Sequence, residues 1–478
     1  MRVTKISLAT MLALGTLTCA SATTQLEEAI KGTTIGGYAY GQYTGMFGDD
    51  ADGSAFRSRV WVDINTGAIS GFSLGTRVFA SIGQGAPNGG RFLANSGIPN
   101  NVAAFGMYAL YGKYSFEALG SKTTMMGGKI NIMTPFNDTA WDYGYGLYVS
   151  NEDIEGIKFS AQAYAAWALD NGNAMYTTIA QDANKNQLNY YDNKASLSTQ
   201  NPLFILGVEG GGEKLAGAAF KLYAATSPDT IDYLVFGDVS YSILDTGVTL
   251  QSQVAVTSVN TDNAAFAYGN PFITADTTDY TAKLRGLYNI QVSYSNKDLG
   301  FGAKAGFTGS FGDGYGALLN YASFNMGGQF WYDTVSSYNG YGITGVGGHK
   351  RMVANSDGTF SAENTDIMVG YVGVTYSGVQ NLKLGLDYAY VGGNNNYVRM
   401  VKSRDNATAK IAEAQAANQP VNPQDIVDAF NTDATFHEVS FTASYDFIPK
   451  KLTLSGLIGM TFGDLQMGRG RVNLKYSF

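Results

Sequence analysis

Few side chains in this 478-residue chain could do acid–base, nucleophilic or metal chemistry. Its two histidines, His349 and His437, are far apart in sequence, and its single cysteine is Cys19. A general base is most often histidine, and a zinc site needs several histidine or cysteine ligands. We expect His349, beside Lys350, in a solvated loop and His437 on the outer face of a strand. No aspartate pair stands out. The residues therefore predict no enzyme, no metal site and no cofactor.

The charged residues that do stand out alternate with apolar ones. Successive side chains of a strand point to opposite faces, so residues 56–65 present one apolar and one charged face. The same alternation places Tyr108 on an apolar, outward face. The charged faces of the first five expected strands carry Arg57, Arg59, Arg77, Lys113 and Lys129. This pattern indicates strands with one face in contact with water and one apolar face.

The last eleven residues, 468–478, repeat this pattern most clearly. Their apolar face ends in Tyr476 and Phe478, whereas the opposite face carries Arg469, Arg471 and Lys475. Such a strand suits a wall with lipid outside and water inside. Residues 280–294 alternate in the same way and are expected to turn Lys283 and Arg285 inward. The aromatic end resembles the closing strand of Gram-negative outer-membrane barrels, where it serves as a signal for the barrel-assembly machinery.

The composition favours a large all-β protein. The chain has 60 Gly, 32 Tyr, only 9 Pro and 15% charged residues, which is typical of a turn-rich, aromatic-rich sheet. Beyond the first residues, no segment has the ~18 consecutive apolar residues of a membrane helix. If the chain crosses a membrane, it must therefore do so as a closed barrel. The acidic balance and the lack of a basic, aromatic stripe argue against nucleic-acid binding.

The first 22 residues have the features of a cleaved signal peptide. Arg2 and Lys5 precede the apolar run 6–17, and Ala20-Ser21-Ala22 gives a small-x-small cleavage site. Without Arg2 and Lys5, the mature chain has 29 basic and 39 acidic residues, a net charge of −10. Residues 23–478 are expected to form one domain, with too few residues before the first strand for a plug.

The alternation predicts a transmembrane antiparallel β-barrel of about 18 strands, with 16 or 20 as alternatives. Short turns on the periplasmic side alternate with long extracellular loops, as in outer-membrane barrels. The alternation fails over residues 312–364, which form either one long loop or a loop with a hairpin near 328–333. The long loops are expected at 83–101, 170–201, 312–364 and 394–434, the last with two helical pieces.

The chain resembles the major outer-membrane porins of the Campylobacter group, which are similar to OprD-type porins. The resemblance is carried by residues 26–31, the strand count, Lys129-Ile130-Asn131 running into Thr134-Pro135-Phe136, and the terminal strand. It implies a homotrimer in outer-membrane lipid and lipopolysaccharide, with an inward third loop near 134–145. Asp138 and Asp142 of that loop would face basic wall residues. The resemblance draws these from Arg57, Arg59, Arg77, Lys113 and Lys129, with Arg469 and Arg471 near the outer mouth. The alternation places Lys283, Arg285, Arg469, Arg471 and Lys475 on the lumen wall.

This arrangement would select solutes rather than catalyse a reaction. Opposed charges across a narrow waist create a field that favours ions and small hydrophilic solutes. The net charge favours a weak cation preference, although the wall itself is basic. One alternative is a surface adhesin whose long loops bind on a barrel scaffold, and another is a substrate-specific channel. Conductance would distinguish the adhesin, and saturable block would distinguish the specific channel.

Overall fold

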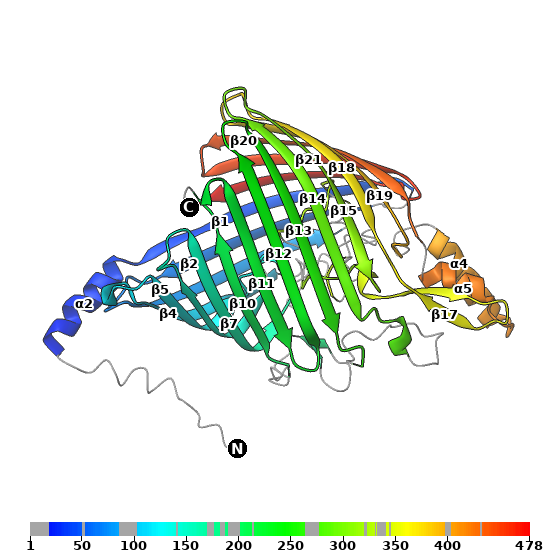
Figure 1. Cartoon of the computed structure of the whole chain (residues 1–478), viewed down its shortest axis with the longest axis horizontal. Coiled ribbons are helices and arrows are strands. Elements are labelled where there is room, and N and C mark those ends of the chain that lie inside the picture. Colours follow the sequence, from blue (N-terminus) through cyan, green and yellow to red (C-terminus); the bar gives the residue numbers. More distant parts are fainter. Residues whose placement is uncertain are drawn as a thin grey trace, which may run out of the picture.

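The computed structural model describes residues 19–49, 53–85, 103–139, 142–169, 176–181, 187–189, 201–212, 215–262, 277–319, 323–329, 331, 341–343, 346–396, 403–430 and 433–478. Among these residues, 18 strands form one antiparallel sheet. The sheet closes because β1 (Thr34–Phe47) pairs with both β2 (Gly53–Asn65) and the last strand, β22 (Gly468–Ser477). The predicted barrel of about 18 strands is confirmed (Figure 1).

Each barrel strand pairs with its neighbours along the chain. Between β2 and β22, the barrel strands are β3 (Phe72–Gly85), β4 (Ala103–Ser115), β5 (Thr123–Asn131), β6 (Tyr143–Asn151), β7 (Ile157–Ala168), β10 (Leu203–Gly210), β11 (Ala218–Ser227), β12 (Ile231–Ile243), β13 (Val248–Val259), β14 (Leu284–Asn296), β15 (Phe301–Gly312), β18 (Met368–Tyr376), β19 (Leu382–Gly392), β20 (Phe436–Ile448) and β21 (Leu452–Gly463).

The alternation of side chains separates a lipid-type outer face from a polar inner face. In β14, Ile290 is 61% exposed on the outside, whereas the neighbouring Asn289 is fully buried on the inside. Exposed aliphatic and aromatic side chains recur in the same way on the other barrel strands. A wall of this kind matches hydrocarbon outside and a polar lumen inside.

The two ends of the barrel differ. One end, here called the turn end, has short connections such as those between β14 and β15 and between β20 and β21. The helix α2 (Cys19–Lys31) lies at this end, where the Gly67 N–H donates to the Ala29 carbonyl over 2.9 Å. The turn after β4 contains the short helix η1 (Glu117–Leu119). The opposite end, here called the loop end, carries α4 (Ser403–Ala416) and α5 (Pro423–Phe430) (Figure 1).

Several short elements lie outside the barrel sheet, at its loop end. They are β8 (Tyr176–Gln181), β9 (Gln187–Asn189), η4 (Thr277–Tyr280), η5 (Val346–Gly348), β16 (Arg351–Ala354), β17 (Phe360–Glu363), α4 (Ser403–Ala416) and α5 (Pro423–Phe430). Met352, Ile411, Ile426 and Val427 form a small apolar cluster that joins β16 to both helices. The helical pieces expected in the loop 394–434 are confirmed.

The uncertain segment 312–364 does contain a hairpin, but at β16–β17 rather than near 328–333. This hairpin is a separate two-stranded sheet and adds nothing to the barrel. The loops expected at 83–101 and 170–201 lie mostly outside the described residues. No helix in the described part of the chain has the length and apolar character needed to span a membrane.

The strand expected at 280–294 begins later, at Leu284. The backbone just before it is bonded to the segment after β15: Thr281 bridges to His349, and the Ala282 N–H donates to the Gly348 carbonyl over 3.0 Å. Lys283 therefore precedes the strand, and its side chain is exposed. The prediction that Lys283 shares the inward face with Arg285 is wrong, because the backbone at Thr281 and Ala282 bonds to residues 348–349 before the strand begins.

Candidate functional site in the barrel lumen

The loop after β5 folds into the barrel. Phe136 is fully buried, and its ring lies 6.1 Å from the rings of both Tyr223 on β11 and Phe236 on β12. On the way, the Gln162 side chain on β7 accepts the Met133 N–H over 3.1 Å and donates to the Met133 carbonyl over 2.8 Å. The loop thus runs along the inner wall from β5 to β12, which places backbone inside the lumen.

The two predicted acidic residues of this loop have different environments. Asp142 is fully buried, and its carboxylate accepts the Asp138 N–H over 2.8 Å. The Asp142 N–H donates in turn to the Asp138 carbonyl over 2.8 Å. Asp142 therefore fixes the shape of the loop, whereas Asp138 remains half-buried. Residues 140–141 of the expected constriction loop lie outside the described residues.

The described residues of a second segment, 313–349, also lie inside the barrel. Glu438 on β20 is fully buried, and its two carboxylate oxygens accept the N–H groups of Gln329 and Trp331 over 2.6 and 2.7 Å. The Gln329 side chain donates to Asp387 on β19 over 2.7 Å, and Lys304 on β15 forms an ion pair with Asp387 over 3.0 Å. The expected extracellular loop is therefore in part a lumenal element, fixed to the wall by buried carboxylates.

The two inward elements contact each other and several strands. The Ser323 N–H donates to the Pro135 carbonyl over 3.2 Å. Gln253 on β13 donates to the Ser323 carbonyl over 2.7 Å and accepts the Asn325 N–H over 2.8 Å. Farther along, Tyr315 donates to the Asn395 carbonyl over 2.5 Å, and burial raises the pKa of Tyr315 well above its ordinary value. Together the two elements lie against the inner wall from β7 to β20.

Arg285 anchors the second segment rather than facing open water. The Arg285 side chain is fully buried. Its Nε donates to the Ala282 carbonyl over 2.7 Å, and Nη1 donates to the Ile343 carbonyl. Ile343 belongs to the inward segment, so this guanidinium holds backbone in place. Such a contact cannot be deduced from alternation, which gives only the side of the sheet.

Five predicted basic residues share one area of inner wall because β1 pairs with both β2 and β22. We call Arg57, Arg59, Arg469, Arg471 and Lys475 the basic wall. Lys475 and Arg59 are both directly opposite Tyr40, on either side of it. Lys475 lies 4.4 Å from the ring centre of Tyr38, and the Arg59 guanidinium lies 5.9 Å from that of Tyr40. Aromatic faces of this kind attract cations and orient them.

Lys129 lies apart from the basic wall, in a cage of tyrosines. Its ammonium lies 4.4 Å from the ring centre of Tyr143 and within 6 Å of those of Tyr108 and Tyr145. It also donates to the Met107 carbonyl over 2.8 Å, and the side chain is 5% exposed. The cage was missed because Tyr108 was expected to face outward. A β-bulge between the pairs Arg77–Ala109 and Val78–Met107 shifts the register at Tyr108 and turns its side chain inward.

Two further predicted basic residues lie toward the turn end. Arg77 forms an ion pair with Asp63, with Nε 2.5 Å from Oδ1, and its guanidinium lies 4.7 Å from the ring centre of Trp61. Lys113 is exposed, directly opposite Ser73 near the start of β3. The structure therefore does not bring Lys113 to the inward loop.

The remaining predicted residues lie on the outer face or in loops. Tyr476 and Phe478 are exposed outside, and the Phe478 backbone exchanges hydrogen bonds of 3.0 and 3.1 Å with Gly37. His437 lies outside as predicted, stacked on Phe462 at 5.3 Å. The expected solvation of His349 is wrong: it is half-buried, because its backbone bridges to Thr281. In the described part of the chain, no three His, Cys, Asp or Glu residues are grouped as metal ligands.

The structure also shows lumenal charges that the sequence analysis did not single out. Lys158, Glu209, Lys221 and Asp238 face inward on β7, β10, β11 and β12 and line a cavity of about 520 Å³ at the turn end. Each alternates with outward apolar neighbours, as Lys221 does with Leu222. The alternation was therefore available in the sequence, but the strand pairing that aligns these four residues was not.

Comparisons with known proteins agree with this architecture. A model of the family described as Campylobacter major outer membrane protein matches residues 1–416. A search of curated proteins finds no match. Among solved structures, the chain is similar to Acinetobacter baumannii OccAB1, with a TM-score of 0.60, 12% identity, and 95% of this chain and 98% of that chain covered.

Two structures from Pseudomonas aeruginosa are also similar. OccK8 (OprE) gives a TM-score of 0.58 at 11% identity, covering 94% of this chain and 98% of that one. OprD gives a TM-score of 0.52 at 12% identity, covering 95% and 97%. At this level of identity, the likeness shows a shared barrel fold.

Proposed function

Because this chain belongs to the Campylobacter major outer membrane protein family, we propose that its lumen passes ions and small hydrophilic solutes between a loop bearing Asp138 and the basic wall. The protein is an outer-membrane β-barrel porin, so the turn end is periplasmic. The observation that carries the proposed constriction is the inward course of the loop, held by Phe136 against Tyr223 and Phe236. A loop held inside a closed barrel narrows the only route through it.

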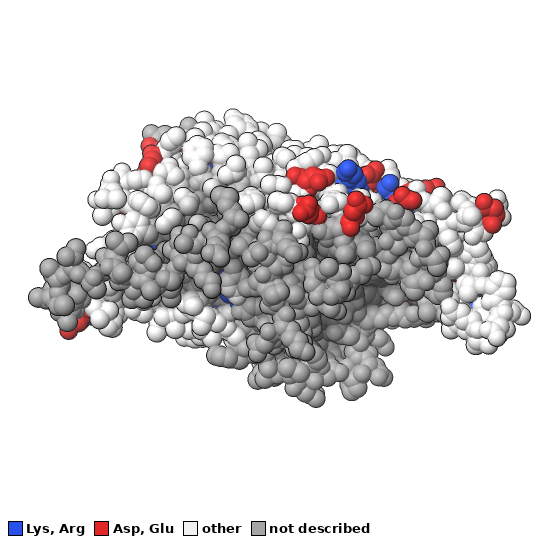
Figure 2. All heavy atoms as spheres, turned by 90° about the horizontal axis from the view of Figure 1, so that it is seen from below, with Lys and Arg blue, Asp and Glu red and all other residues white. Residues whose placement is uncertain are grey.

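Selection in this proposal is electrostatic. Charges lining a narrow, low-dielectric passage act on every passing ion, whereas exposed charges more than about 8 Å away are screened by salt. The full chain has a net charge of −8, and the charged side chains visible in Figure 2 are mostly acidic. Outer charges of this sign concentrate cations at the mouth, while the basic wall and Asp138 decide passage within.

The oligomer and the assembly signal are further parts of the proposal. The family resemblance supports a homotrimer in a membrane of lipid and lipopolysaccharide. The outward position of Tyr476 and Phe478 at the periplasmic end supports their role as the signal for the assembly machinery, because both remain accessible on a strand end.

The test is the single-channel conductance and reversal potential of the purified protein in a planar bilayer under a salt gradient. We expect openings in threes. Asp138→Asn should shift the reversal potential towards anion preference, and Arg471→Gln should shift it towards cation preference. Lys450→Gln, in the exposed turn between β20 and β21, changes net charge equally and should leave the potential unchanged.

Two outcomes would contradict the proposal. If folded protein gives no conductance, the adhesin reading of the long loops is favoured. If Lys450→Gln shifts the potential as much as Arg471→Gln, overall charge controls selectivity and the constriction does not.

A further inference from the structure

The periplasmic half of the lumen contains a cavity whose charges alternate in sign. The cavity has a volume of about 520 Å³ and is lined by β7, β10, β11, β12 and β13 with adjoining turns. Four of its charged residues form one row across neighbouring strands. Lys158 is directly opposite Glu209, Glu209 is opposite Lys221, and Lys221 is opposite Asp238. The row therefore reads plus, minus, plus, minus.

Neutral groups, rather than the lysines, satisfy the acidic members of this row. Gln251 donates to both Asp238 oxygens over 2.9 and 3.1 Å, and Gln253 donates to Oδ2 over 2.9 Å. Glu209 accepts the Tyr223 hydroxyl over 2.5 Å. These contacts fix the carboxylates without cancelling their charge.

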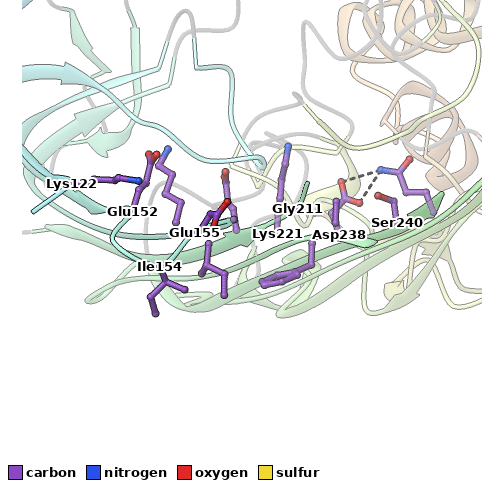
Figure 3. A pocket seen from close by; sticks show the side chains of 16 residues that line it. Lys122, Glu152, Ile154, Glu155, Gly211, Lys221, Asp238 and Ser240 are labelled. Atoms are coloured by element: carbon purple, nitrogen blue, oxygen red, sulfur yellow. Dashed lines mark hydrogen bonds between the residues drawn. The ribbon is translucent and has the colours of Figure 1, made fainter. Parts of the chain in front are cut away.

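Lys221 of the row remains available to a solute, whereas the Lys158 ammonium is hydrogen-bonded to the Tyr148 side chain and lies in the field of Glu209. Within the described residues, no carboxylate lies within the 4.0 Å ion-pair distance of Lys158 or Lys221. In Figure 3, the Lys221 side chain rises from the wall and ends apart from Asp238, whose carboxylate bonds to Gln251. Opposite charges on adjacent strands usually lie close enough to interact. Here they interact without an ion-pair contact, so charge of both signs lines the cavity.

The spacing of these charges indicates the class of solute. Directly opposite residues in an antiparallel pair lie roughly 4.5–5.5 Å apart at their Cβ atoms. A molecule with an ammonium and a carboxylate a few bonds apart can contact two successive members of the row. A solute of a single sign is attracted by one member and repelled by the next. The cavity volume lies within the roughly 300–1,000 Å³ typical of small-molecule sites.

Beyond Asp238, the row continues towards the loop end as neutral polar residues. Asp238 is opposite Gln253, Gln253 is opposite Asn289, and Asn289 is opposite Thr308. Gln253 and Thr308 are bonded to the inward segment at Ser323 and Asn325. The charged part of the row is therefore the part that lines the cavity, with the buried Asp238 at the end next to the neutral residues.

We propose that Lys158, Glu209, Lys221 and Asp238 form a subsite for zwitterionic solutes, namely free amino acids and short peptides. This inference rests on the proposed porin function and adds a solute class to it. The carboxylate of the solute contacts a lysine of the row, while its ammonium contacts the neighbouring acid.

The experiment measures block of ion current by solutes added on the periplasmic side of a planar bilayer. The probes are glycylglycine, the anion N-acetylglycine, the cation glycylglycinamide and the neutral N-acetylglycinamide, which are similar in size. We expect glycylglycine to block at about tenfold lower concentration than any of the others, a difference of about 1.4 kcal/mol.

The matched variant is the double exchange Glu209→Lys with Lys221→Glu. It keeps composition and net charge but orders the row plus, plus, minus, minus. We expect conductance to persist and the preference for glycylglycine to disappear. Lys221→Met alone should reduce the preference and serves as the test if the double variant does not fold.

Equal block by all four probes in the wild-type channel would overturn the subsite. A preference that survives both variants would overturn it as well. Either result leaves an open channel, so neither can be confused with failure of the proposed function, which would appear as a silent bilayer.

Discussion

Lys129 shows how neighbours can withdraw a lumenal charge from the solute path. Its ammonium is enclosed by Tyr108, Tyr143 and Tyr145 and is bonded to the Met107 carbonyl. Lys113 is on the same wall but is exposed. Alternation predicted that both lysines point inward. It could not distinguish the buried lysine from the exposed one, because the burial of Lys129 depends on a bulge at Tyr108 that the sequence does not mark.

Substitution of Lys129 should therefore affect stability more than selectivity. A desolvated cation–π contact contributes about 2 kcal/mol, and a hydrogen bond from a charged group contributes about 1.5–3 kcal/mol. We expect Lys129→Met to lower the free energy of unfolding by about 2 kcal/mol in urea titrations of the folded barrel. The matched Lys113→Met should change it by less than about 0.5 kcal/mol. Equal effects of the two variants would show that the cage contributes nothing to stability.

Among the elements, the inward segment 313–349 departs most from expectation. Its sequence lacks alternation, which left open whether it forms one long loop or includes a hairpin near 328–333. The position of this segment inside the barrel depends on side chains far away in sequence, chiefly Glu438 and Arg285, which form hydrogen bonds with its backbone. Such contacts carry no local signal. The loop after β5 was predictable because its position follows from counting strands and from the family resemblance.

Loss of the Glu438 carboxylate should release this segment. Two backbone N–H groups, of Gln329 and Trp331, would lose their acceptor, and each buried unsatisfied group costs about 1–3 kcal/mol. We expect Glu438→Ala to give larger and noisier single-channel currents. Glu438→Gln, which keeps one acceptor oxygen, should have a smaller effect.

Glu363→Ala removes an exposed carboxylate from β17 and so controls for the loss of one negative charge in Glu438→Ala. It should leave the single-channel current and its noise unchanged. Wild-type current and noise in Glu438→Ala would mean that other contacts hold the segment.

At the scale of the whole molecule, the sequence predicted the architecture well. The 18 strands follow from period-two alternation, since lipid outside and water inside make the pattern regular. In β14, the expected outward Ile290, Val292 and Tyr294 are all exposed. Closure was also predictable, because a lipid-exposed sheet edge is excluded by its unpaired backbone groups. Which residues share a row was not predictable, since register needs the pairing of strands.

The last strand completes this closure, so its end should control assembly. Phe478 exchanges two backbone hydrogen bonds with Gly37 and ends the outward aromatic face. We expect deletion of Phe478 to reduce the heat-modifiable, folded fraction in outer membranes several-fold, measured by gel mobility with and without boiling. Phe478→Tyr keeps the ring and the backbone bonds and should assemble normally. Normal assembly of the deletion variant would exclude a role for the terminal ring.

The row of polar residues across β7 to β15 is inclined to the membrane because barrel strands are tilted. Lys158 is next to Ile157 at the periplasmic end of β7, whereas Thr308 lies seven residues beyond Phe301, the periplasmic end of β15. The row therefore follows a helical path of fixed handedness along the barrel wall. A zwitterion that moves along it rotates about the barrel axis while its ammonium and carboxylate keep their order. Mirror-image amino acids held in this way turn their side chains to opposite sides, so the channel wall is a chiral surface.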